Sequence, residues 1–322
     1  CRCITAWPTD PREWPGDLLE GARAEVASLV RAIVADGGEE VVLLVGSGES
    51  EASARQVLGQ IPVRYLPLAY GDIWLRDTGP LFVILDGTVV ARCFRTNGWG
   101  GKYDFPDDHG LGARIARALD VPVEECDWIL EGGAVESNGA GTALTTEECL
   151  LNPNRNPEMS RTDVEAALAR DLGVAKVIWL RRGLAGDHTD GHVDNVARFV
   201  SPRTVVCMKA TSVDDPNAET LSEIEAALRA ATDTEGHPFD VVTIPSPGRV
   251  EDSSGELLAA SYLNFYVGKQ AVIVPTYGTN DEAAIEALRA LFPERKLIGI
   301  RSANLIRGGG SFHCITQQQP EA

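Results

Sequence analysis

Residues 81–94, LFVILDGTVVARCF, carry the clearest local pattern in the chain. Two runs rich in apolar and β-branched residues flank Asp86-Gly87, and an Asp-Gly pair in this position is a strong signal of a two-residue hairpin turn. The pattern predicts paired strands at 81–85 and 88–94. A helix is expected next, at 111–119, where apolar residues recur at helical spacing.

Similar units of strands and helices recur along the chain. Further strands are expected at 40–45, 63–67, 141–145, 193–200, 204–208, 264–267 and 271–275, and further helices at 14–36, 51–60, 162–172, 217–231 and 281–291. Each unit holds two or three strands and one helix in about 60 residues, and roughly five units fit the chain. The pattern indicates an α/β fold, arranged either as a closed ring of units or as an ordinary open sheet.

Composition and charge restrict the class of protein. The 322 residues are 44% hydrophobic, without an apolar run near the roughly 20 residues of a membrane-spanning helix, so a membrane protein is not expected. The formal charge of -18 opposes binding to nucleic acid and suits either a cationic small molecule or simple solubility. The sequence does not reveal the oligomeric state, so a homo-oligomer stays open.

The cysteines indicate the redox environment. There are seven, an odd number with irregular spacing, so a complete disulfide framework is excluded. We expect reduced thiols in a cytoplasmic protein, and no secretory signal pattern opens the chain. Four of the cysteines are expected to be core residues: Cys93, Cys126, Cys149 and Cys207.

Cys314 differs from the other cysteines in its setting. It follows three glycines, 308–310, and His313 in the segment RGGGSFHC. Glycines let the backbone approach a ligand closely, so Gly310 is a candidate ligand contact and Cys314 a candidate nucleophile.

A second polar cluster lies at 186–195, GDHTDGHVDN. If this segment is extended, His188, Asp190, His192 and Asp194 share one face. Such a face fits two kinds of site, a zinc or iron site, or a catalytic histidine with carboxylates that bind a cationic substrate. The segment by itself does not decide between them.

Three weaker segments add candidates. Asp72 and Asp77 flank Trp74, and carboxylates beside an indole ring can hold a planar cation. Glu131 precedes two glycines, and Asn97 and Trp99 lie in a glycine-rich segment. In isolation, the segment with Asp72 and Asp77 fits a surface turn ending at Gly79-Pro80 better than a site, and the other two segments fit an ordinary turn or loop.

Taken in order, these segments resemble the agmatine deiminase family. The resemblance rests on YGDIWLRDTGP (70–80), FRTNGWGGKY (94–103), ILEGGAVESNGAGTALTTEECLLNPNRNP (129–157), GDHTDGHVDNVARFVSP (186–202), YLNFY (262–266) with VPTYGTND (274–281), and GGGSFHC (308–314). It extends from about Trp7 to the C-terminus. Six ordered segments are far more specific than any one short motif.

The resemblance implies a fold, an activity and a set of site residues. The fold is a five-bladed α/β propeller, with residues 1–322 as a single catalytic domain and the site on the central axis. The activity is hydrolysis of agmatine to N-carbamoylputrescine and ammonia, without metal or organic cofactor. The implied roles are Cys314 as nucleophile, His192 as general acid and base, Asp77, Glu131 and Asp194 as guanidinium-binding carboxylates, and Trp74 as a substrate-contacting ring. Asp72, Asp190, Asn97, Trp99 and Gly310 are further candidate substrate contacts.

The residue types suit this chemistry. A guanidinium ion is planar, cationic and a poor electrophile, so its hydrolysis needs carboxylates that hold it, a strong nucleophile and a proton for the departing ammonia. Attack by the Cys314 thiolate would leave a covalent amidino-thioether for water to cleave. Protonated His192 and the bound cation together are expected to stabilise the thiolate against the nearby carboxylates.

Three alternatives remain open at this point. A deiminase of arginine, peptidyl-arginine or another guanidino metabolite would hold a substrate carboxylate with a basic residue such as Arg76, Arg95 or Arg155. An amidinotransferase would pass the same intermediate to an amine. A non-catalytic binding protein would keep the propeller without the chemistry.

Overall fold

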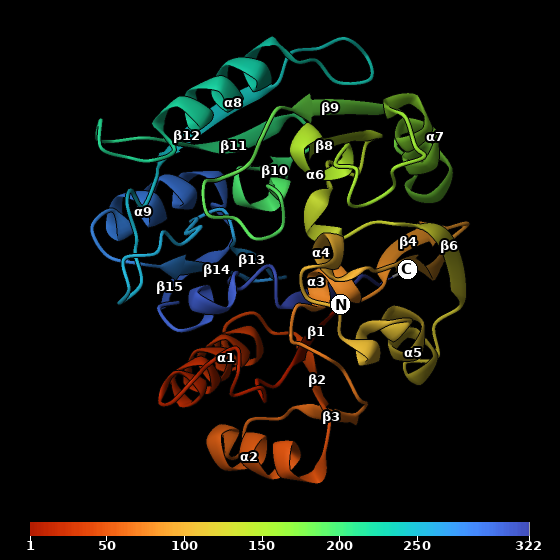
Figure 1. The fold of residues 1–322 in the computed structure, drawn as a ribbon, viewed down its shortest axis with the longest axis vertical. Helices are drawn as coiled ribbons and strands as arrows, with labels where there is room; N and C mark the ends of the chain where they lie inside the picture. The colour runs from red at the N-terminus through yellow and green to blue at the C-terminus, as the bar shows by residue number, and fades with distance from the viewer. Residues whose placement is uncertain (322) are drawn as a thin grey trace.

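The structure is a computed structural model that describes residues 1–321 (Figure 1). In that part of the chain the strands form five mixed sheets. The sheets follow one another around a common centre, and the longer helices lie at the periphery (Figure 1). The predicted five-bladed α/β propeller is therefore confirmed.

The strands and helices group by blade. The first blade has β1 (Arg2–Ala6), β2 (Glu40–Val45), β3 (Arg64–Pro67), β16 (Thr316–Gln319), α1 (Leu18–Ala35) and α2 (Gly48–Leu58). The second has β4 (Leu81–Leu85), β5 (Thr88–Arg95), β6 (Val123–Ile129) and α5 (Leu111–Ala118). The third has β7 (Glu136–Ser137), β8 (Thr142–Thr146), β9 (Lys176–Leu180), α6 (Glu147–Leu150) and α7 (Arg161–Leu172). The fourth has β10 (Ala197–Ser201), β11 (Thr204–Lys209), β12 (Asp240–Pro245) and α8 (Ala218–Ala230). The fifth has β13 (Tyr266–Val267), β14 (Ala271–Thr276), β15 (Lys296–Arg301) and α9 (Asp281–Leu291).

One pairing plan repeats in every blade. A middle strand, β1, β5, β8, β11 or β14, pairs antiparallel with one neighbour and parallel with another. Parallel neighbours need a crossover, and a helix supplies it between each such pair. In the first blade the antiparallel partner comes from the other end of the chain, because β16 pairs with β1. This pairing closes the ring.

Local sequence explains several of these elements. Asp86 and Gly87 have φ of 49° and 76°, the left-handed conformation that a tight hairpin turn between β4 and β5 requires. Ser47 and Ser160 form capping boxes at the starts of α2 and α7. The hairpin at 81–94 and the helix at 281–291 form where the sequence predicts them.

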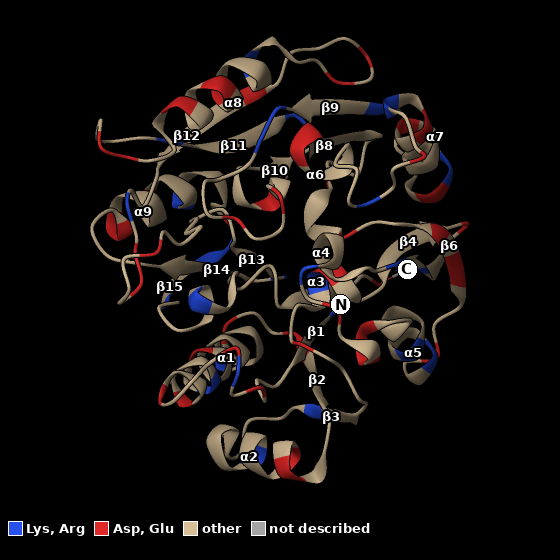
Figure 2. Ribbon diagram, viewed as in Figure 1, with Lys and Arg blue, Asp and Glu red and all other residues tan. Residues whose placement is uncertain are grey.

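The apolar core lies within the blades. The largest cluster joins α1, β1 and β2 to the second blade and includes Ile4, Leu29 and Leu43, each fully buried. A second cluster joins β8 and β9 to the fourth and fifth blades, and a smaller one joins β6 to the third blade. Acidic residues are spread along the outer helices α7, α8 and α9 (Figure 2). Among residues 1–321, no helix has both the length and the apolar character that crossing a membrane would need.

Four short turns carry chain toward the centre of the ring. They are α3 (Leu75–Thr78) and the 3-10 turns η2 (Gly132–Ala134), η3 (Val193–Asn195) and η4 (Leu305–Gly308). The structure thus corrects the strand expected at 193–200, because its first residues form η3 and β10 begins at Ala197. Two further short turns are α4 (Gly98–Gly101) and η1 (Pro106–Asp108).

Candidate active site

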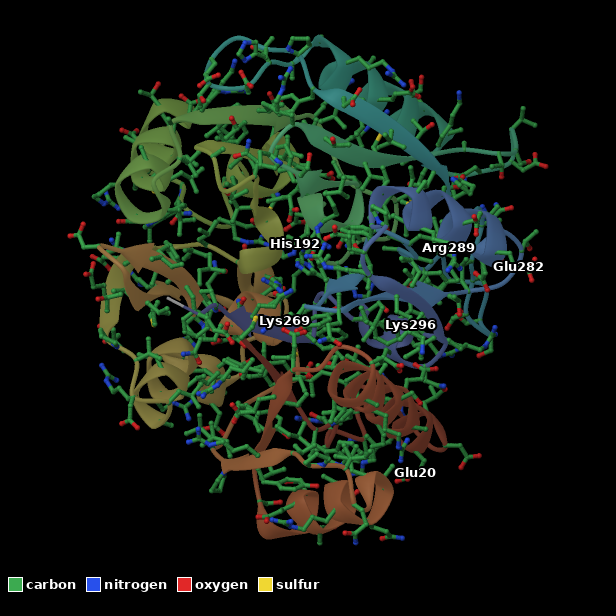
Figure 3. All side chains as sticks on the ribbon, turned by 180° about the vertical axis from the view of Figure 1, so that it is seen from behind. Glu20, His192, Lys269, Glu282, Arg289 and Lys296 are labelled. Carbon is green, nitrogen blue, oxygen red and sulfur yellow. The ribbon has the colours of Figure 1, made fainter. Side chains whose placement is uncertain are left out.

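The candidate catalytic residues come from separate blades and meet inside the ring. Asp77 lies on α3, Glu131 just before η2, His192 and Asp194 at η3, and Cys314 between η4 and β16. Figure 3 shows His192 near the middle of the molecule, whereas Glu20 and Glu282 lie at its edge. All five candidates are buried, with at most 8% of any of them exposed.

Gly133 shows how closely three of these side chains converge. A Cβ atom built on it would lie 2.5 Å from His192 Nδ1, 3.0 Å from Asp77 Oδ1 and 3.1 Å from Asp194 Oδ2. Any larger residue at this position would collide with the site. The Gly133 N–H donates to Asp77 Oδ1 at 2.9 Å, so the glycine also orients one carboxylate.

Cys314 lies in a strongly acidic setting. Its Sγ is 3.8 Å from Asp194 Oδ2. Burial, with the charges of Asp194 and Asp77, raises the pKa of the Cys314 thiol well above its ordinary value. A reactive thiolate therefore requires compensation from a donor or a cation.

His192 is placed as a proton donor. Its Nδ1 is 3.7 Å from Asp77 Oδ1 and its Nε2 is 4.0 Å from Glu131 Oε2, and neither nitrogen has a hydrogen-bond partner within residues 1–321. Burial lowers the pKa of His192, but Asp77, Cys149 and Glu131 raise it, and the net direction is well above the ordinary value. The imidazole is therefore expected to carry a proton at neutral pH.

The carboxylates of Asp77 and Asp194 differ in how many of their oxygens already accept a hydrogen bond. Asp77 Oδ2 accepts the Trp99 indole N–H at 2.9 Å, which together with Gly133 fixes the carboxylate plane. Asp194 Oδ2 is paired with His313 Nδ1 at 2.7 Å, and Oδ1 is buried without a partner in the described part of the chain. Burial raises the pKa of Asp194 to about 7, although His192 acts to lower it. An unpaired buried acceptor of this kind fits the N–H of a cationic ligand.

Glu131 faces the histidine and a buried arginine. Arg155 Nε donates to its Oε1 at 2.6 Å, while Oε2 is directed at His192 and lies 4.0 Å from Cys149 Sγ. The Arg155 guanidinium also donates to Asp190 Oδ2 at 2.7 Å. The arginine thus compensates two carboxylates next to the site.

A pocket opens onto Cys314. Its volume is about 70 Å³, and its buried lining residues are Asp72, Trp74, Asp77, Trp99 and Cys314. The rest of the lining is Glu13, Tyr103, His188, Thr189, Arg307, Gly308 and Gly309. Asp72 Oδ2 accepts the Trp74 indole N–H at 2.8 Å, which holds that ring in the pocket wall. Aromatic rings beside carboxylates give the pocket the features of a site for a planar cation.

The comparisons with known proteins agree with this geometry. The model of the Porphyromonas-type peptidyl-arginine deiminase family matches residues 1–320. The chain belongs to this family.

Individual members give the same result. The agmatine deiminase of Stutzerimonas stutzeri is 37% identical over 345 residues, which cover 98% of this chain and 91% of that protein. The structure of the agmatine deiminase of Enterococcus faecalis is 30% identical, with a TM-score of 0.93 over 99% of this chain and 93% of that chain. The structure of a C. jejuni agmatine deiminase with substrate bound is 27% identical, with a TM-score of 0.89 over 98% of this chain and 92% of that one.

Three of the predicted substrate contacts, Asn97, Asp190 and Gly310, lie outside the pocket lining. The Asn97 side chain accepts from Gly100 N at 3.0 Å and donates to the Asn154 backbone carbonyl at 2.8 Å. Asp190 accepts from Lys102 Nζ at 2.6 Å as well as from Arg155. Both side chains tie loops together beside the site.

The segment 186–195 is not extended, which corrects the shared strand face. Asp190 has φ of 64°, and η3 begins two residues after Gly191. His188 is exposed and lines the pocket, whereas His192 is fully buried. The four-residue metal face expected from an extended segment therefore does not form.

A different set of donors does come together. Atoms of Glu131, Cys149 and His192 lie within 4.8 Å of one another, as in a three-ligand metal cluster. However, Arg155 already donates to Glu131, and the raised pKa of His192 favours the imidazolium form, which cannot bind a metal. These residues fit a charged network better than a metal centre.

Three side chains at the site were missed from the sequence. Asn264 Nδ2 lies 3.0 Å from Cys314 Sγ, and His313 contacts Asp194. Cys149 Sγ lies within 4.8 Å of a ring nitrogen of His192. All three occur in quoted family segments, which was the available signal. The expectation that Cys93, Cys126, Cys149 and Cys207 are buried is confirmed.

Proposed function

We propose that this protein hydrolyses agmatine to N-carbamoylputrescine and ammonia through a covalent amidino-thioether on Cys314. The observation that carries the proposal is the pocket in which Cys314 meets Asp77 and two tryptophans, with Asp194 and the proton-bearing His192 beside it. Full-length similarity to two proteins named as agmatine deiminases supports the same reaction.

The first half of the proposed reaction forms the covalent intermediate. Asp77 and Asp194 hold the guanidinium, with the unpaired Asp194 Oδ1 accepting one of its N–H groups. The Cys314 thiolate attacks the central carbon and forms a C–S bond. As the tetrahedral intermediate breaks down, one C–N bond is cleaved, and His192 gives its proton to the departing ammonia. Glu131 is proposed to hold the imidazole and raise its basicity.

The second half releases the product. Neutral His192 takes a proton from water, and the resulting hydroxide adds to the amidino carbon. Collapse of this adduct breaks the C–S bond and returns the thiolate, and loss of the hydroxyl proton to solvent leaves a ureido group on the product. The same histidine thus acts as acid and then as base. The residues supply each proton, so no cofactor is needed in this proposal.

The pocket favours a cationic tail on the substrate. Glu13 and Asp72 both line it, and the charge of Glu13 acts on the Asp72 carboxyl group. Burial, with Glu13, raises the pKa of Asp72 well above its ordinary value, and burial, with Asp10, raises that of Glu13. A primary ammonium such as that of agmatine would relieve this unfavourable proximity.

A substrate carboxylate has less support. Of the three arginines considered for it, Arg155 is bound to Glu131 and Asp190, Arg76 donates to Gln317 Oε1, and Arg95 pairs with Asp127, and none lines the pocket. Arg307 does line it, so a deiminase of arginine or peptidyl-arginine is the second candidate.

The setting of the protein is also part of the proposal. We infer a cytoplasmic enzyme in which residues 1–322 act as one catalytic domain. Seven free thiols among residues 1–321 are consistent with a reducing compartment. A site assembled from residues 77 to 314 supports a single catalytic unit. Association into a homo-oligomer is left to a sedimentation measurement.

Ammonia release tests the reaction and its rivals. The substrates are agmatine, arginine, peptides ending in arginine and short guanidino acids, with Cys314→Ala as control. The proposal predicts release from agmatine without any added amine, abolished in the control. Release from arginine alone would show that arginine, and not agmatine, is the substrate. Turnover only with an added amine would indicate an amidinotransferase, and no release at all would favour a binding protein.

A further inference from the structure

The mechanism leaves open what keeps Cys314 reactive before substrate binds. The charged groups that face it include Asp194 and Asp77, which disfavour the thiolate. His192 is the nearby cation from η3, but no hydrogen bond links it to the sulfur among the described residues. His313, next in the chain, has a pKa lowered well below its ordinary value by burial, Arg198 and Arg76, and is neutral.

Asn264 supplies a donor at this position. It is 1% exposed and lies two residues before β13, and its Nδ2 is 3.0 Å from Cys314 Sγ. Within residues 1–321 it is the only side chain that donates a hydrogen bond to this sulfur. Asn195 Oδ1 accepts from the same Nδ2 at 2.9 Å, so both amide hydrogens are engaged.

The orientation of this amide is fixed by its other end. Asn264 Oδ1 accepts the backbone N–H of His313 at 2.9 Å and that of Cys314 at 3.2 Å. A flipped amide would set its NH₂ group against these two donors, so the NH₂ group must face the sulfur. The side chain thus clamps the backbone of the nucleophile and points a donor at its reacting atom.

We propose that Asn264 is a catalytic residue whose amide N–H stabilises the Cys314 thiolate. A hydrogen bond to the charged form of a group favours that form, and it strengthens as charge develops on the acceptor. The Ser311 backbone N–H and the Asn264 amide both lower the pKa of Cys314, against the effects of burial and the carboxylates. The inference rests on the proposed role of Cys314 as nucleophile.

Two substitutions separate this role from a structural one. Asn264→Asp keeps an oxygen acceptor for both backbone N–H groups but replaces the donor beside the sulfur with a carboxylate. Asn264→Ala removes the acceptor and the donor together. A purely structural role predicts that the alanine variant is affected more. Thiolate stabilisation predicts that the aspartate variant is affected at least as much, although its backbone clamp is kept.

The experiment is the rate of Cys314 alkylation by iodoacetamide between pH 5 and 10, without substrate, followed by mass spectrometry of the Cys314 peptide. Asn195→Ala is the matched control, because it loosens the same network without removing the donor to sulfur. Both Asn264 variants should react about tenfold more slowly at neutral pH and shift the profile upward by roughly one unit, whereas the control shifts much less. Thermal unfolding identifies a variant that is not folded.

The possible outcomes are distinct. An Asn264→Asp profile that coincides with the wild type, or a shift in the alanine variant alone, would overturn the proposal. If Asn264→Ala does not fold, the aspartate variant decides. Agmatine turnover that persists in Cys314→Ala would instead refute the proposed role of Cys314 in catalysis. The alkylation profiles would still measure the reactivity of the Cys314 thiol.

Discussion

At the scale of single residues, the site has to satisfy two opposed requirements. Carboxylates such as Asp77 and Asp194 are needed to hold a guanidinium, yet they oppose formation of the Cys314 thiolate. Burial sharpens both effects, because charges interact more strongly away from water. The protein balances them with a protonated His192, the Asn264 donor and the substrate's own charge. Binding and activation of the nucleophile are thereby coupled.

The raised pKa of Asp194 predicts how binding depends on pH. The guanidinium binds the ionised carboxylate, whose pKa is about 7 in the free protein, so binding expels the proton that Asp194 carries at lower pH. The affinity of Cys314→Ala for agmatine should be constant above pH 7 and fall about tenfold per unit below it. Calorimetric titration between pH 5 and 8 measures this. A Kd that is constant over the range would contradict the assignment.

Arg155 is predicted to contribute mainly to stability. Its side chain is fully buried between Glu131 and Asp190, and Arg155→Leu leaves the buried Glu131 charge uncompensated, whereas Asp190 keeps Lys102. The free energy of unfolding should fall by about 3–5 kcal/mol, measured by urea denaturation. Arg161→Leu, which removes an exposed pair with Glu147, is the matched control and should cost at most about 1 kcal/mol. Equal losses in the two variants would refute the role of burial.

At the scale of elements, the longer helices and nine of the strands were predicted, whereas the other strands and the site-bearing turns were not. The strand at 40–45, the hairpin at 81–94 and the helix at 281–291 follow local signals that agree with the fold. By contrast, an extended 186–195 would place His188, Asp190, His192 and Asp194 on one face, but Gly191 and a left-handed Asp190 turn the segment into η3. Distant residues also hold the chain near this turn, as where the Gly183 N–H donates to Glu148 Oε2. Such contacts leave little signal in the residues of the turn itself.

The residues of the site were also only partly predictable from local sequence. The family segments led to Cys314, His192 and the carboxylates, because catalytic residue types stand out in a sequence. Asn264 was overlooked since its role depends on contacts 50 residues away in the chain. Seven strands of residues 1–321 were also missed, namely β1, β6, β7, β9, β12, β15 and β16.

The glycine-rich turn before Cys314 offers a test at this scale. A Cβ at Gly310 would lie 2.8 Å from Trp74 Cζ3, 2.9 Å from Cys314 Cβ and 3.0 Å from its Sγ. Gly310→Ala must therefore displace the ring or the nucleophile, and kcat with agmatine should fall about 10²-fold. Gly48→Ala on α2, where a Cβ meets nothing within 4 Å, is the control. Near-normal kcat in Gly310→Ala would show that the turn is not tightly constrained.

At the scale of the whole molecule, closure of the ring joins the chain ends to the site. Strand β16 pairs with β1 and follows Cys314 directly, and its Gln317 and Gln318 accept from the buried Arg76. The Arg76 backbone N–H donates in turn to the Cys314 carbonyl at 3.0 Å. The nucleophile is therefore held by the same contacts that close the propeller.

Removal of this closure should destabilise the whole ring. Deleting residues 316–322 removes β16. The buried Arg76 guanidinium then loses both of its glutamine partners. We expect Tm to fall by roughly 5–10 °C in calorimetry, together with loss of ammonia release. Deleting only 320–322 leaves β16 in place and serves as control. Identical Tm values for the two truncations would argue against closure as a source of stability.

The central claim is that Cys314 carries the amidino group during turnover, and acid quenching tests it most directly. Protein mixed with agmatine is quenched within the first turnovers, digested and analysed by mass spectrometry. The account predicts one amidino group on the Cys314 peptide of the wild type, and neither adduct nor ammonia release in Cys314→Ala. Ammonia release by Cys314→Ala, or an adduct on Cys149 instead, would contradict it.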